Sequence, residues 1–230
     1  MKKIIISAIL LAVLLGGTSC MGNGSDQQNI IEVALVYMEQ KYGESFIYVG
    51  PWGRSPSTTF ELLVASESFP DRHILVQIDN YRSVDDRIFR DNYIAVKYKE
   101  ESIRFFQNTV SGIFGDVIIF YSVYMGGQSH DLPANATFEE FLADTHSPHV
   151  VFIELKASTF SSKNQIENVA ELLAASGAHF YLTALVVDDN EFGAHDINMH
   201  RENISFGRFV HFAGITISNE GIEITWREAA

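Results

Sequence analysis

The spacing of apolar residues along the chain predicts four amphipathic helices. In the first, Ile30, Ala34 and Met38 recur at intervals of four, which places them on one face of a helix. Three of the four segments are followed directly by a glycine, the residue that most often ends a helix. Thr137 and Glu140 form a capping box at the start of another. The predicted helices cover residues 29–42, 93–114, 137–144 and 162–176.

Alternating or continuous apolar runs predict strands between these helices. They cover residues 45–49, 58–65, 73–81, 117–124, 150–155, 179–187, 205–218 and 221–226. The last two are joined by Asn219, Glu220 and Gly221, which predicts a hairpin. Residues 117–124 are apolar on both faces, so we expect a central strand there. The fold class expected is α+β, with mostly antiparallel sheet and parallel pairing where a helix crosses over.

Two stretches interrupt the periodic pattern. Residues 126–136 contain two glycines and a proline and show no periodicity, which predicts a linker. The expected organisation is therefore an N-terminal α+β subdomain over residues 29–125 and a C-terminal one over residues 137–230, either packed together or sharing one sheet. Residues 50–57 contain two prolines and two glycines, which predicts a loop between two strands.

The first twenty residues have the three parts of a secretory signal. Lys2 and Lys3 precede an apolar run over residues 4–15, and small residues then lead to Cys20. This run is too short to span a bilayer as a helix, which takes about 20 residues. The sequence therefore predicts an exported protein.

Residues 15–20 (LGGTSC) resemble the lipid-attachment site of bacterial lipoproteins. In that family the mature protein begins with a lipid-modified cysteine, and Leu usually stands three positions before it, where this chain has Gly17. The resemblance implies a signal peptide over residues 1–19, a lipid such as palmitate on Cys20, and a tether over residues 20–28. It also implies anchoring to a membrane surface outside the cytoplasm, in the cell envelope. An ordinary secretory signal cut after Ser19 is the other interpretation.

Charge and cysteine content narrow the range of partners. Lys2 and Lys3 fall within the signal, so 14 basic residues remain against 29 acidic ones, a net charge of −15. Nucleic acid is therefore not an expected partner, because phosphate binding needs a basic surface. Cys20 is the only cysteine, so the fold has no disulfide and an exported chain has a use for that sulfur in lipid attachment. The rest of the chain resembles, in pattern only, small uncharacterised exported bacterial proteins.

Trp52 and Arg54 are the candidate ligand-binding residues. They lie among glycine, proline and serine in the predicted loop. An exposed Trp beside an Arg stacks on a sugar ring or anchors a protein contact. A tryptophan folded back over the local core is the alternative. The favoured function is a binding or structural role towards an envelope protein, peptide or glycan.

A metal-assisted envelope hydrolase is the competing hypothesis. Residues 188–202 follow a buried strand and gather metal-type ligands, of which Asp188, Asp189, His195 and His200 are the main candidates; Glu191, Asp196 and Glu202 accompany them. The two histidines are five positions apart, which does not suit one helical face, and no zinc-protease motif is present.

Other features predict no chemistry. No nucleophile elbow of the Gly-x-Ser-x-Gly kind occurs, so no catalytic residue and no cofactor are predicted. Glu61 and Glu154 stand within predicted strands, and we expect both to point to solvent.

Overall fold

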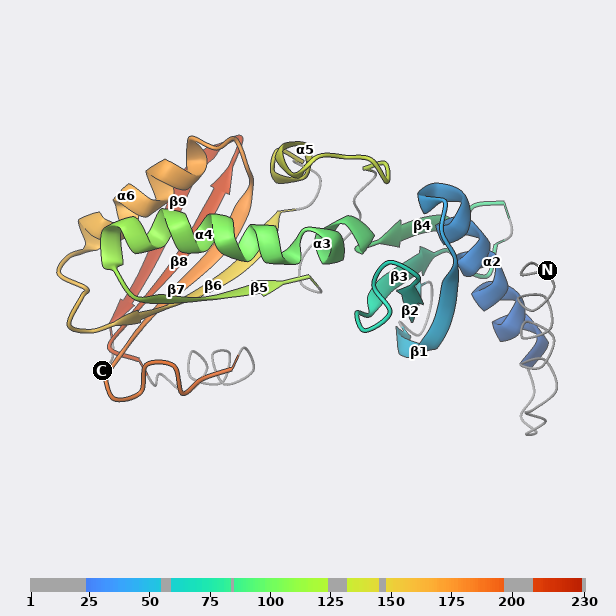
Figure 1. The fold of residues 1–230 in the computed structure, drawn as a ribbon, viewed down its shortest axis with the longest axis horizontal. Coiled ribbons are helices and arrows are strands. Elements are labelled where there is room, and N and C mark those ends of the chain that lie inside the picture. The colour runs from blue at the N-terminus through green and yellow to red at the C-terminus, as the bar shows by residue number, and fades with distance from the viewer. Residues whose placement is uncertain are drawn as a thin grey trace, which may run out of the picture.

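The computed structural model describes residues 24–54, 59–83, 85–123, 132–144, 148–196 and 209–228. These residues form an α+β fold with a four-stranded and a five-stranded sheet, both mostly antiparallel, which confirms the predicted fold class. Figure 1 shows the two sheets next to each other along the long axis of the molecule. Within the described ranges, no helix is both long and apolar enough to cross a membrane.

The four-stranded sheet is a meander covered on one face by a helix. Its strands pair in chain order and all antiparallel: β1 (Phe46–Arg54), β2 (Thr59–Ser66), β3 (Ile74–Asp79) and β4 (Ile88–Asp91). Helix α2 (Gly24–Tyr42) packs against this sheet (Figure 1). Ala34 and Met38 of the helix and Leu62 and Val76 of the sheet are fully buried. We call this face of the sheet the inner face and the opposite one the outer face.

The five-stranded sheet contains the one parallel strand pair among the described residues. Its order is β5 (Val117–Ser122), β6 (His149–Lys156), β7 (Phe180–Val187), β8 (His211–Ser218) and β9 (Gly221–Glu228). β6 and β7 are parallel because α6 (Lys163–Ala174) crosses over between them, as predicted. α6 and α4 (Lys99–Phe114) lie on one face of the sheet (Figure 1). The short helices α3 (Tyr93–Lys97) and α5 (Phe138–Leu142) lie towards the four-stranded sheet.

Asn92 joins the two sheets. Its side chain is completely buried; Oδ1 accepts a hydrogen bond from the Leu75 N–H at 2.7 Å, and Nδ2 donates one to the Val123 carbonyl at 2.7 Å. Tyr98 adds a hydrogen bond from its hydroxyl to the Ala136 carbonyl. One cluster of buried apolar side chains includes members from both sheets. The halves therefore share a core and a buried polar link.

The sheets divide the chain at a different place from the one predicted. β5 belongs to the predicted N-terminal subdomain, yet it pairs with β6, on the far side of the predicted linker. The division between the sheets falls between β4 and β5. The prediction was wrong because pairing depends on which strands meet in space, and the composition of residues 126–136 carries no information about that. Residues 124–131 lie outside the described ranges.

β5 is also an edge strand, whereas a central strand was predicted for residues 117–124. Its residues alternate between buried and half-buried along the strand. Continuous apolar sequence therefore reflects partial cover of the second face and not pairing on both sides.

Further differences from the predicted elements occur in α2, in β4 and in the helix predicted over residues 93–114. α2 begins at Gly24, so the end of the predicted tether is helical; polar residues extend a first helical turn without needing burial, and Asp26 favours a helix start. A short strand, β4, lies within residues 82–91, where only a loop was expected. The predicted helix over 93–114 is divided at Tyr98 into α3 and α4. Cys20 lies outside the described residues.

Candidate functional site

Trp52 lies on the edge strand of the four-stranded sheet and not in the predicted loop. β1 continues through residues 50–54, with register shifts between Tyr48 and Gly50 and between Pro51 and Gly53. Each shift inserts one extra residue, so the strand bends but keeps pairing with β2. The bulges explain the error, because they accommodate Gly and Pro in a strand whose sequence is typical of a loop.

β1 exposes an apolar row to solvent. The exposed fraction is 67% for Ile47, 42% for Val49 and 52% for Trp52. Ile47 pairs with Ala65 of β2 and therefore lies on the outer face, opposite α2. Three large apolar side chains on one edge strand are unusual, because edge strands are normally protected by charge. Arg54 is the last residue of the strand, and its side chain lies outside the described part of the chain.

The predicted metal-binding loop begins directly after β7. Asp189 Oδ1 accepts a hydrogen bond from the Ser158 N–H at 3.0 Å, and this bond holds the pKa of Asp189 below its usual value. Lys156 binds Asp116 at 2.7 Å and lies over the Phe192 ring. These contacts fasten the start of the loop to the ends of β5 and β6.

His195 is paired with Glu154, which sequence reasoning placed in solvent. Glu154 is completely buried in β6, between Ile118 of β5 and Leu185 of β7. Its Oε2 lies 2.9 Å from His195 Nδ1, and its Oε1 accepts a hydrogen bond from the Gly193 N–H at 2.6 Å. The solvent prediction for Glu154 was wrong, because a loop about 40 positions later in the chain folds over the strand.

This buried pair fixes the histidine ring. With Glu154 ionised, Nδ1–H of His195 donates to the carboxylate, and the lone pair is on Nε2. A carboxylate that orients a histidine in this way occurs both beside general-base histidines and behind histidines that bind metals. No period or motif marks Glu154, but a lone Glu within an otherwise apolar strand was an available signal.

The described residues do not gather the predicted ligands around an ion. Among them no group of three His, Asp, Glu or Cys side chains is placed to hold a metal. Asp189 binds Ser158 and His195 binds Glu154, which separates two of the candidates. His200 and Glu202 lie outside the described ranges.

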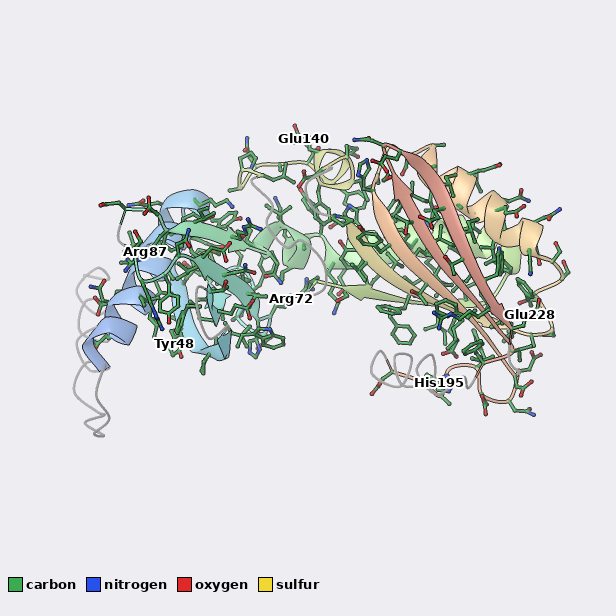
Figure 2. The ribbon with its side chains drawn as sticks, turned by 180° about the vertical axis from the view of Figure 1, so that it is seen from behind. Tyr48, Arg72, Arg87, Glu140, His195 and Glu228 are labelled. Carbon is green, nitrogen blue, oxygen red and sulfur yellow. The ribbon has the colours of Figure 1, made fainter. Side chains whose placement is uncertain are left out.

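The two candidate regions are on different sheets. Figure 2 shows His195 in the segment beside the five-stranded sheet and Tyr48 of β1 on the four-stranded sheet, far along the molecule. Trp52 and the acidic loop therefore belong to separate surfaces.

Two further buried polar groups, Tyr121 and His149, lie in the five-stranded half. His149 Nδ1 and the Tyr121 hydroxyl are 2.7 Å apart, inside a group of aromatic rings that includes Phe106, Phe141 and Phe180. Burial raises the pKa of Tyr121, so its hydroxyl stays protonated. This pair joins β5 to β6 within the core and suits a structural role.

Comparison with known proteins gives one similarity. No protein-family model matches the chain, and no curated protein sequence matches it. Among solved structures, the chain is similar to the crystal structure of a DUF5037 family protein from Ruminococcus gnavus ATCC 29149, with 13% sequence identity and a TM-score of 0.45. That match covers 83% of this chain and 92% of the other.

Proposed function

We propose that this chain is a lipid-anchored binding protein of the bacterial cell envelope, without catalytic activity. The observation that carries the binding role is the exposed row of Ile47, Val49 and Trp52 on β1. The anchor is proposed from the sequence around Cys20. α2 begins four residues after Cys20, and β1 follows the other end of this 19-residue helix, so the binding surface is linked to the anchor through about 28 Å of helix.

The row acts through side chains and not through strand pairing. Pro51 has no N–H to offer a neighbouring strand, and the two bulges disturb the spacing of the edge. An exposed Trp contributes a large rigid contact area, which makes such residues frequent anchors of binding surfaces. The exposed side chains of β1 are thus the proposed contact surface for an envelope component.

Affinity capture from a detergent extract of the envelope tests the binding role. We expect Trp52→Ala to lose at least one component that the wild-type chain retains. Tyr181→Ala is the matched control, because Tyr181 is an aromatic residue on a strand of the other sheet with 49% of its surface exposed. An unchanged profile of captured components for Trp52→Ala would contradict the proposal.

Fractionation tests the anchor separately. We expect Cys20→Ala to release the chain from membranes or to leave its signal uncut. If that variant is processed normally and sediments with membranes, the lipid attachment is wrong.

A hydrolase remains the second candidate, favoured by the buried Glu154–His195 pair. In this function His195 Nε2 would hold a metal ion or accept a proton from water, with Glu154 orienting the ring. Metal analysis and thermal shift with zinc separate the candidates. The hydrolase requires a bound metal that His195→Asn loses or a hydrolytic activity that His195→Asn abolishes. The binding protein requires neither.

A further inference from the structure

A polar row crosses all four strands of the first sheet on its outer face. Gly53 pairs with Glu61, Glu61 with Gln77, and Gln77 with Arg90. Paired residues in antiparallel strands project to the same side, so the Glu61, Gln77 and Arg90 side chains stand next to one another. They lie opposite the inner face, where Phe60 and Leu62 are buried under α2.

Asp79 sets the charge of this row. Its Oδ1 accepts hydrogen bonds from Gln77 Nε2 at 2.9 Å and from the Thr59 hydroxyl at 3.0 Å. Its Oδ2 lies 3.4 Å from Arg90 Nε. Asp79 and Arg90 therefore neutralise each other. Glu61 adds a negatively charged hydrogen-bond acceptor to the half-exposed face.

Trp52 stands at one end of the row. It is the extra residue between Pro51 and Gly53, and Gly53 pairs with Glu61. Neighbouring strands are about 4.8 Å apart, so the row from β1 to β4 is about 14 Å long. The platform is therefore a carboxylate and an amide in the middle and a guanidinium at the β4 end, with the exposed Trp52 next to its β1 end in the chain.

We infer that this platform binds a neutral glycan chain, an inference that rests on the proposed binding function and specifies its ligand. A pyranose ring packs its apolar C–H face against an indole, and its hydroxyls need both acceptors and donors. Glu61 supplies acceptors, and the N–H groups of Gln77 and Arg90 that do not bind Asp79 supply donors. Glu61 and the net charge of −15 that remains without the signal repel an acidic polymer, and the bulged edge with Pro51 opposes an added peptide strand.

Co-sedimentation of the full-length chain in non-ionic detergent with insoluble polysaccharides tests the inference. The probes are the neutral polysaccharides chitin, cellulose and curdlan. We expect binding to at least one of them, weakened at least tenfold by Trp52→Ala and severalfold by Glu61→Ala. Tyr181→Ala is expected to bind as the wild type does. No binding to any of the three probes, or equal binding by Trp52→Ala, would overturn the inference.

A second measurement does not depend on the stability of Trp52→Ala. Trp226 is the other tryptophan of the chain and lies on β9 of the five-stranded sheet. In Trp226→Phe the emission therefore reports on Trp52 alone, and titration with a soluble oligosaccharide of the polysaccharide that the chain binds, such as chitohexaose for chitin, is expected to shift it saturably. An unchanged emission would count against the glycan platform. If Trp52→Ala loses a captured protein while no polysaccharide binds, the glycan is wrong and the binding function stands.

Discussion

The two sheets each bury a carboxylate, and the surroundings of the two differ. Among the described residues, Asp91 at the end of β4 and Glu154 in the middle of β6 are the acids that are fully buried. The Asp91 carboxylate accepts hydrogen bonds from Lys41 Nζ at 2.8 Å and from the Tyr42 hydroxyl at 2.6 Å, and both donors lie on α2. Glu154 receives a backbone N–H and an imidazole from one loop. The first links a helix to its sheet, and the second links a loop to a sheet.

The two carboxylates differ in whether their partners can reach water once the carboxylate is removed. The Lys41 side chain has only 17% of its surface exposed, so its charge cannot easily return to water. Burial, followed by the nearby Asp91 charge, raises the pKa of Tyr42, which keeps its hydroxyl protonated as a donor. Gly193 and His195 belong to a surface loop that can move outwards. A buried carboxylate held by a helix should therefore matter more for global stability than one held by a loop.

Asp91→Ala should have the largest effect. It leaves the ammonium group of Lys41 without its buried counter-charge, which we expect to cost about 3–5 kcal/mol of the free energy of unfolding. Urea denaturation followed by circular dichroism measures this value. Asp85→Ala, at an exposed acid between β3 and β4, is the control and should change little. A loss of less than about 1 kcal/mol would contradict the expectation that the carboxylate held by a helix contributes more to stability than the one held by a loop.

Glu154→Ala should cost less, about 1–3 kcal/mol, because its donors can turn to water when the loop opens. We expect faster proteolysis within the loop as well, with the remainder of the fold intact. Glu223→Ala, at an exposed position of β9, is the matched control. The double mutant with His195→Asn should show non-additive losses of stability, since the two residues share one interaction. A cost equal to that of Asp91→Ala would mean that the loop is part of the global fold.

Glu44→Gln should have the smallest effect, visible only as a change in pH dependence. Burial raises the pKa of Glu44, but hydrogen bonds from Ser68 and Tyr93 outweigh it, so the net pKa is lowered. A lowered pKa in the folded state stabilises the fold above the unfolded pKa of about 4.3, and this contribution disappears as the pH falls through the folded value. Because Glu44 is only half-buried and water screens its contacts, we expect less than about 1 kcal/mol.

Thermal unfolding at pH 6 and pH 3 measures this difference. The wild type should lose more stability between the two values than Glu44→Gln does. Glu67→Gln is the control, because Glu67 is exposed and follows directly after β2. Identical losses of stability in the wild type and in Glu44→Gln would show that the contacts of Glu44 make no pH-dependent contribution to stability.

Local signals predicted well where the chain makes its own contacts. The capping box at Thr137 is formed, with Glu140 N–H donating to the Thr137 hydroxyl and the Thr137 N–H donating to the Glu140 carboxylate. Gly115 ends α4 with a φ of 75°, a conformation in which side chains other than glycine are strained. The hairpin of β8 and β9 closes between Ser218 and Gly221 as expected.

The surroundings of the candidate residues were predicted only in part. Trp52 was expected in a loop and is exposed, but it lies in a strand, because the bulges that keep it there depend on pairing with β2. The alternation of Ile74, Val76 and Ile78 indicates that Gln77 and Asp79 share a face. The alignment of Gln77 with Glu61 and Arg90 depends on register, which three strands set together.

The sequence by itself determined most of the elements, the fold class and the likeness of the Cys20 site to a lipoprotein signal. These follow from residue spacing, capping and composition, which act over a few positions. Only the tertiary structure decided that β5 lies at an edge, that Glu154 is buried under His195, and that Trp52 stands beside a polar row. Each of these depends on residues far apart in the chain meeting in space, and the free energy of such meetings comes from packing and desolvation, which no local pattern encodes.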